Sequence, residues 1–198
     1  MYAISLTSIP PRLPRIRPVL ESLLAQRPAP AAVYLYLPRV WERFGVMSAP
    51  FEVPDVVVIH SVEVDDGPAL KAIQFCSSPP ILVQRLIYCD DDWIYPQGWA
   101  KALLQAGSPA DAVAASGYSL HRLKRQGGVE RAGFVDIAQG FGGVSVAPEW
   151  LDLPDIAPPP NARLADDIWL SAQLARQGIG IRLCPEARHG LRPAFEDG

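Results

Sequence analysis

Three consecutive aspartates, Asp90-Asp91-Asp92, follow a mostly apolar run at 85–89 and are the residues best suited to chemistry. The run has the composition of a buried strand, so the carboxylates would emerge at an edge of a sheet. Side chains alternate along a strand, which would let Asp90 and Asp92 converge on one ligand. Like charges about 4 Å apart repel by roughly 4 kcal/mol at an effective dielectric of about 20, so the cluster either raises its pKa values or recruits a cation. Carboxylate oxygens favour Mg²⁺, Mn²⁺ or Ca²⁺ over zinc or copper; the alternative is a solvated acidic turn before Pro96.

A second acidic pair, Asp166-Asp167, opens a segment whose pattern over 165–177 predicts a helix ended by Gly178. Carboxylates are favoured in the first turn of any helix by its dipole and its unpaired N–H groups. One aspartate can therefore cap the helix while its neighbour, about 100° further around, points into a cleft.

The elements that would position these side chains alternate between strands and helices over the first 107 residues. The expected strands are 2–9, 32–37, 56–59 and 85–89, and the expected helices are 15–26, 69–76 and 97–105. This alternation predicts an α/β fold with a parallel sheet and right-handed crossovers, which binds ligands at the carboxyl ends of its strands. The continuous apolar run 56–59 predicts a strand buried on both faces. We expect 38–55 to form an irregular but packed connection, and we assign it no function.

Beyond residue 110 the strict alternation ends. Strands are expected at 112–116 and 179–183, with a basic turn at 121–125 and a glycine-rich segment at 139–146 between them. We therefore expect a small mixed part at the C-terminal end of the sheet.

Bulk properties exclude several classes of protein. The 198 residues are 49% hydrophobic, enough for one domain with a sizeable core, and a net charge of -3 gives no footprint for nucleic acid. The longest apolar runs fall far short of the roughly 20 residues of a transmembrane helix. The start of the chain lacks a signal-peptide pattern, so the cytoplasm is the expected compartment. Three cysteines without C-x-x-C spacing, Cys76, Cys89 and Cys184, are expected to be buried thiols rather than a disulfide framework or a zinc site.

The order of these motifs resembles nucleotide-sugar glycosyltransferases of the GT-A fold, and in particular small bacterial family 2-like enzymes with a D-x-D motif. The likeness covers nearly the whole chain. It rests on Ile9-Pro-Pro-Arg12, Asp66-Gly-Pro68 with Lys71, Asp90-Asp91-Asp92 before Tyr95-Pro96, Gly140-Phe-Gly-Gly143, Asp166-Asp167 and His189. The chain departs from the family pattern at Asp166, where glutamate is commoner, and this leaves open which of the two aspartates is the base.

The resemblance implies a Rossmann-like GT-A sheet with helices on both faces in one glycosyltransferase domain, 1–198. Residues 1–107 would be the nucleotide-binding half and 108–198 the acceptor and catalytic half. It implies transfer from a nucleoside diphosphate donor, expected to be a UDP-sugar, to a hydroxyl of a glycan, a lipid-linked or a small-molecule acceptor. The implied cofactor is Mn²⁺ or Mg²⁺.

The resemblance also implies roles for individual residues. Nucleotide contacts fall on Thr7, Ser8, Arg12, Asp65, Asp66, Lys71, Asp90 and Asp91. Sugar or acceptor contacts fall on Gly140, Phe141, Gly142 and Gly143, metal ligation on Asp90, Asp92 and His189, and catalysis on Asp167 and Asp166. Simpler interpretations remain open. Asp65 and Asp66 could be ordinary turn residues before Gly67-Pro68, and Arg12 and Lys71 could be surface cations. The glycine-rich loop could be a plain hairpin turn, and His189 an exposed or packed histidine.

Two other functions remain open at this stage. A nucleotidyltransferase would normally carry a glycine-rich phosphate loop after the first strand, and 9–12 has no glycine. A catalytically inactive module that binds sugar nucleotides is the second alternative. For an active enzyme we expect inversion at the anomeric carbon, because the remaining acids of the C-terminal half fall in no motif that would supply a nucleophile. These acids are Glu130, Asp136, Glu149, Asp152 and Asp155.

Overall fold

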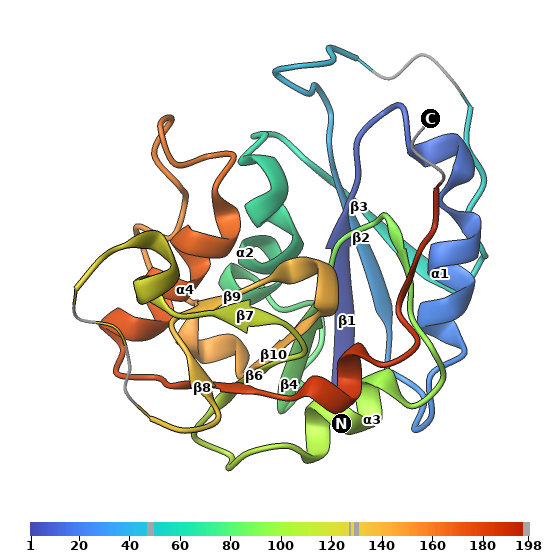
Figure 1. Cartoon of the computed structure of the whole chain (residues 1–198). Helices are drawn as coiled ribbons and strands as arrows, with labels where there is room; N and C mark the ends of the chain where they lie inside the picture. Colours follow the sequence, from blue (N-terminus) through green and yellow to red (C-terminus); the bar gives the residue numbers. More distant parts are fainter. Residues whose placement is uncertain (47–49, 127, 129–130, 196–198) are drawn as a thin grey trace.

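The computed structural model describes residues 1–46, 50–126, 128 and 131–195, and its centre is an eight-stranded sheet (Figure 1). In spatial order the strands are β3 (Val57–Val62), β2 (Val33–Pro38), β1 (Tyr2–Thr7), β4 (Arg85–Tyr88), β10 (Val144–Val146), β6 (Ala112–Ala114), β11 (Ile181–Leu183) and β8 (Phe134–Val135). The first four are parallel, whereas β10 is antiparallel to both of its neighbours. β11 is parallel to β6, and β8 is antiparallel to β11. The predicted mostly parallel sheet with a mixed C-terminal part is confirmed.

Helices cover both faces of the sheet and enclose two separate apolar cores (Figure 1). One core lies under α1 (Arg17–Leu24) and α3 (Trp99–Gln105), and the other under α2 (Leu70–Ser77) and α4 (Asp166–Arg176). Along β1, Ile4 and Leu6 enter the first core and Ala3 enters the second, as alternation along a strand requires. The helices on both faces are confirmed.

Short elements complete the described part of the chain. β5 (Trp93–Ile94) pairs with β12 (Arg192–Pro193), and β7 (Gly117–Tyr118) pairs with β9 (Ile137–Ala138). The 3₁₀ helices are Leu13–Arg15, Gly67–Ala69, Leu120–Leu123, Gly140–Gly142, Pro148–Trp150 and Pro185–Arg188. The β5–β12 pairing returns the end of the chain to the aspartate triplet, where the Ala194 N–H donates to the Asp92 carbonyl at 2.8 Å.

One prediction about the sheet is wrong. β3 was expected to be buried on both faces, but Val58 and Ile59 are 39% and 44% exposed. The reason is its place in the sheet, since β3 lies at an edge and pairs only with β2 among the described strands. The prediction for the cysteines is confirmed, because Cys76, Cys89 and Cys184 are all buried free thiols.

The carboxyl ends of β1 to β4 meet at one edge of the sheet, because these strands are parallel. The segments that follow β1, β3 and β4 at this edge carry most of the residues predicted to bind nucleotide. Within the described residues, no helix has both the length and the apolar composition needed to cross a bilayer.

Candidate active site

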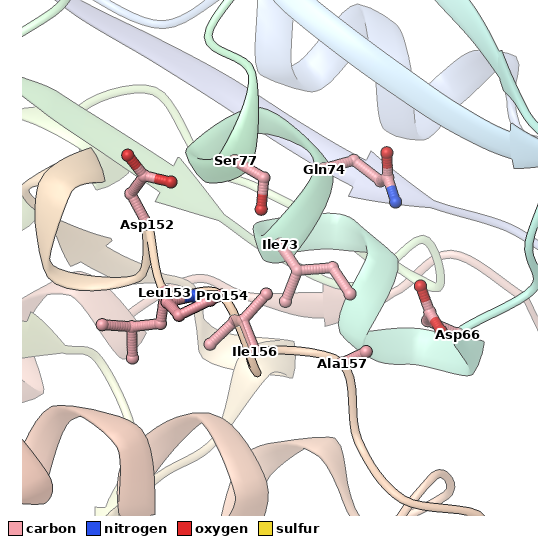
Figure 2. A pocket seen from close by; sticks show the side chains of 9 residues that line it. All are labelled: Asp66, Ile73, Gln74, Ser77, Asp152, Leu153, Pro154, Ile156 and Ala157. Atoms are coloured by element: carbon pink, nitrogen blue, oxygen red, sulfur yellow. The ribbon is translucent and has the colours of Figure 1, made fainter.

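A cavity of about 610 Å³ lies at the carboxyl ends of the four parallel strands. Most of the residues predicted to bind nucleotide or to catalyse line it: Thr7, Ser8, Arg12, Asp65, Lys71, Asp90, Asp91, Asp166 and Asp167. Asp66 is the exception. Its side chain lines a separate, open hollow of about 500 Å³ between α2 and the 152–157 segment (Figure 2). The structure therefore brings together the predicted donor and catalytic residues, and separates Asp66 from its neighbour Asp65.

The three adjacent aspartates divide between two ionic clusters. In the Arg12 cluster, Arg12 Nη1 lies 2.7 Å from Asp91 Oδ1 and Nη2 lies 2.9 Å from Asp92 Oδ2. Asp90 pairs instead with Lys71. The expected convergence of Asp90 and Asp92 on one side is wrong, because β4 ends before the aspartates, and Asp91 and Asp92 lie in a bend where strand alternation no longer applies.

The Arg12 cluster joins the segment after β1 to the segment after β4. Ser8 Oγ donates a hydrogen bond to Asp91 Oδ2, and Thr7 Oγ1 donates to the Tyr36 carbonyl at 2.8 Å. Burial raises the pKa of Asp91, and the hydrogen bond from Ser8 and the charge of Arg12 oppose that rise. The Arg12 side chain is 32% exposed, so this cluster is open to water and to a ligand.

The Lys71 cluster consists of Lys71, Asp90 and Asp166, and it is far more enclosed. The Lys71 side chain is only 2% exposed, and its Nζ pairs with Asp90 Oδ1 and, at 2.7 Å, with Asp166 Oδ2. Burial alone would lower the pKa of Lys71, but the charges of Asp90, Asp166 and Asp167 hold that pKa well above its usual value. The alternative of a surface lysine is therefore wrong.

Both catalytic candidates lie in the first turn of α4, and neither is its N-cap. The N-cap is Ala165, which makes no side-chain capping hydrogen bond. Asp166 is paired with Lys71, whereas Asp167 Oδ1 accepts a hydrogen bond from the Gly140 N–H at 2.8 Å. Burial raises the pKa of Asp167 to about 6, and the charge of Lys71 opposes this rise. A carboxyl group with this pKa can accept or release a proton near pH 6.

The glycine-rich segment Gly140–Gly143 packs behind these carboxylates and is not part of the cavity lining. A side chain at Gly140 would collide with Lys71 Nζ, and one at Gly143, where φ is +88°, would collide with the Trp99 ring. Trp99 Nε1 donates to the Gly142 carbonyl at 2.7 Å. A plain hairpin is excluded, because β9 and β10, on either side of the segment, pair with different strands.

Phe141 is the one residue of this segment with a side chain, and it is partly buried. Its ring packs against Trp93, with the ring centres 5.0 Å apart, and the Arg188 guanidinium lies 5.6 Å from the ring centre. Its carbonyl accepts a hydrogen bond from the Tyr95 hydroxyl at 3.2 Å. The predicted contacts of Gly140–Gly143 to sugar or acceptor stay a prediction.

The charges around the cavity favour a bound cation. Among the described residues that line it, six side chains are acidic and four are basic. Asp92 is not among the lining residues, but its Oδ1 is buried and has no hydrogen-bond partner in the described part. His189 is exposed and is not among the lining residues, and no three acidic, histidine or cysteine side chains in the described ranges are grouped to hold a metal by themselves. Asp90 and Asp92 pair with different cations, but their carboxylate oxygens, together with oxygens of a ligand, are of the kind that Mg²⁺ or Mn²⁺ prefers.

Two parts of the cavity wall have no counterpart in the sequence predictions. One is the segment after β2, from which Trp41, Glu42, Arg43 and Phe44 contribute to the lining, and the other is Arg163 with its neighbour Leu164. Trp41 Nε1 donates to the Ser8 carbonyl at 3.0 Å, which fixes this segment to the end of β1. In the sequence, only two features could have indicated these parts of the wall: two aromatic residues in an irregular connection, and an arginine three positions before Asp166.

Comparison with known proteins gives a likeness in structure. No protein-family model and no curated protein matches the sequence. Glucosyl-3-phosphoglycerate synthase from Mycobacterium tuberculosis in complex with Mg²⁺ and UDP is 13% identical, with a TM-score of 0.53 over 92% of this chain and 68% of that one. The same enzyme with Mn²⁺, UDP and phosphoglyceric acid is 14% identical, with a TM-score of 0.54 over 91% and 66%. The same enzyme with Mn²⁺, UDP-glucose and glycerol 3-phosphate is 14% identical, with a TM-score of 0.53 over 90% of this chain and 66% of that one.

This chain therefore spans about two thirds of the length of those enzymes. At such low identity the likeness concerns the fold alone. The protein has the Rossmann-like α/β fold of GT-A glycosyltransferases.

Proposed function

We propose that this protein is a metal-dependent glycosyltransferase that moves a sugar from a nucleoside diphosphate donor, expected to be a UDP-sugar, to an acceptor hydroxyl. The observation that carries the proposal is the cavity itself. At the carboxyl ends of parallel strands, in a fold of the GT-A type, it collects Asp90 and Asp91 beside Asp167, a carboxylate with a raised pKa. Residues 1–107 would bind the nucleotide, and 108–198 would supply the acceptor site and the base.

On the donor side, the ends of β1 and β4 supply the groups that suit a nucleoside diphosphate. Thr7 and Ser8 line the cavity and would contact the base, and the partly exposed guanidinium of Arg12 suits a phosphate oxygen. Asp90 and Asp92 would hold Mg²⁺ or Mn²⁺, with His189 as the predicted further ligand. The metal would neutralise charge on the leaving diphosphate.

On the acceptor side, Asp167 would act as the general base. The Gly140 N–H fixes one carboxylate oxygen of Asp167, which leaves the other free to receive the proton of the acceptor hydroxyl. Asp166 is a poorer candidate, because its carboxylate is neutralised by Lys71. The acceptor would be a glycan, a lipid-linked or a small molecule.

The positions of the unassigned acids of the C-terminal half support inversion. A retaining double displacement needs a nucleophile on the opposite face of the sugar. Asp136, Glu149, Asp152 and Asp155 do not line the cavity, and Glu130 lies outside the described residues. NMR couplings of the anomeric proton in donor and product would test this, because an unchanged configuration would contradict a single displacement.

The proposal as a whole is tested by titrating UDP into wild type and Asp92→Ala, each with Mn²⁺ or with EDTA. We expect measurable affinity only for the wild type with Mn²⁺, since removing the metal or its ligand leaves the diphosphate beside an excess of carboxylates. Equal affinity in all four samples would refute the metal assignment. A screen of UDP-sugars for transfer by the wild type then separates an enzyme from an inactive binding module.

A further inference from the structure

An ionic cluster joins Asp65 to two residues outside the predicted machinery, Glu42 and Arg163, and so links three separate segments around the cavity. Arg163 Nη1 pairs with Glu42 Oε2, and Arg163 Nη2 lies 3.2 Å from Asp65 Oδ2. The same Asp65 oxygen accepts a hydrogen bond from the Glu42 N–H at 2.8 Å, and the other, Oδ1, accepts one from the Gly67 N–H at 2.9 Å. Asp65 therefore faces donors from the segment after β2, from its own turn and from the segment before α4.

The turn after β3 is shaped to receive Arg163. The Arg163 side chain is only 16% exposed. A Cβ at Gly67 would lie 2.9 Å from the Arg163 carbonyl oxygen and 3.0 Å from its Cγ, and Gly67 has a φ of +66°. Only a residue without a side chain allows this close approach, so packing as well as charge holds Arg163 against the turn.

The position of this cluster links it to both halves of the site. Glu42, Asp65 and Arg163 all line the 610 Å³ cavity. Arg163 precedes the two aspartates that open α4 by three and four residues, so its anchoring limits where they can lie. Protein groups already pair with both carboxylate oxygens of Asp65, so this residue needs no nucleotide as a partner. Asp65 therefore helps to hold the segment after β2 and Arg163 in place.

We infer that Arg163 is a positioning residue of this site. By binding Glu42 and Asp65 it holds the wall formed by 41–44 and the start of α4 in the relative position that the donor nucleotide requires. This inference rests on the proposed function, because the ligand whose binding it supports is the nucleoside diphosphate of the donor. Arg163 thus connects the segment 41–44 with the start of α4, which carries the catalytic aspartates, and this connection does not depend on the metal.

The experiment compares UDP affinity, measured by calorimetry with Mn²⁺, and turnover in three single variants and one double variant. Arg163→Gln removes the cation, Glu42→Gln removes one partner on a largely exposed side chain, and Arg163→Lys keeps the charge without the two-pronged geometry. We expect Arg163→Gln to weaken UDP binding about 10-fold and Glu42→Gln to weaken it by a smaller factor. Arg163→Lys should recover part of the loss, and the double variant Arg163→Gln/Glu42→Gln should lose less than the product of the single effects.

The matched control is Arg39→Gln. Arg39 pairs with Glu63 at 2.9 Å close by, but both side chains are largely exposed and neither lines the cavity, so UDP affinity should stay at the wild-type value. Wild-type UDP affinity in both Arg163→Gln and Glu42→Gln would overturn the inference. Glu42→Gln keeps the inference testable if Arg163→Gln does not fold. Absence of UDP binding by the wild type would instead overturn the proposed function.

Discussion

The two ionic clusters at the edge of the sheet are built from similar residues but differ in their access to water. Arg12 is 32% exposed and bridges Asp91 and Asp92, whereas Lys71 is 2% exposed and bridges Asp90 and Asp166. A cation in contact with solvent can exchange a carboxylate for a ligand phosphate at little cost, but a buried one cannot. The comparison indicates that the Arg12 cluster can take part in binding, while the Lys71 cluster holds the carboxylates in place.

The largest expected effect comes from breaking the Lys71 cluster. Lys71→Met keeps the length of the side chain but leaves the carboxylates of Asp90 and Asp166 without their shared cation. Removing one partner of a buried ion pair costs about 3–5 kcal/mol, so we expect a loss of this size in the free energy of unfolding, measured with urea.

Arg17→Met is the control for that measurement. Arg17 pairs with Glu21 one helical turn away at 2.9 Å, and both side chains are more than half exposed. Its loss should change the free energy of unfolding by about 0.5 kcal/mol. Equal, small losses in the two variants would show that the burial of Lys71 does not distinguish the clusters.

The next effect concerns Asp167, which lies beside the Lys71 cluster but is not its direct ion-pair partner. Asp167→Asn keeps the shape but removes the proton acceptor, so turnover should fall about 10²-fold or more while UDP affinity stays within about twofold. The measurement is steady-state transfer at saturating donor together with a UDP titration. Wild-type turnover in Asp167→Asn with a loss in Asp166→Asn would identify Asp166 as the base.

Much of the framework around these clusters can be predicted from the sequence, because its signals are local. Proline and glycine bound the helices, apolar runs mark the strands, and acidic residues directly after a strand fall at its carboxyl end. The burial of β3 could not be predicted, since a central strand and an edge strand can have the same apolar composition.

The partners of each charge could not be predicted either. The sequence indicates that Arg12 and Lys71 are available cations, but their choice among Asp90, Asp91 and Asp92 depends on the bend after β4. The role of 41–44 and Arg163 depends on contacts between segments about 120 residues apart, and no local periodicity carries that information. Such contacts arise from the tertiary fold alone.

A change of pH should have a smaller effect, and it should change turnover and stability in opposite directions. The pKa of Asp167 is raised from 3.8 to about 6, so the base becomes protonated below about pH 6 and turnover should fall up to tenfold for each further pH unit. Stability should change in the opposite direction. Because the folded state binds this proton more tightly than the unfolded chain does, the contribution of Asp167 to stability rises as pH falls from about 6 to about 4.

Urea unfolding of wild type and Asp167→Asn at several pH values isolates this contribution, since the other carboxylates are common to both proteins. The difference in unfolding free energy between them should depend on pH within this window and be constant above it. A constant difference from pH 4 to 8 would contradict the raised pKa.

The smallest effect expected at the two clusters is the stability cost of Arg12→Gln, which tests the Arg12 cluster as Lys71→Met tests the Lys71 cluster. The glutamine amide can still donate to one carboxylate, Ser8 continues to donate to Asp91, and water already reaches the Arg12 position. We therefore expect a loss of about 1 kcal/mol in the free energy of unfolding, with a clear loss of UDP affinity in the same variant. Salt at about 1 M should weaken the wild-type Arg12 cluster and reduce the difference between the two proteins, because exposed charges are screened. A cost of about 3 kcal/mol that salt does not change would mean that Arg12 is as fixed as Lys71, and that the donor phosphate must be bound by other groups.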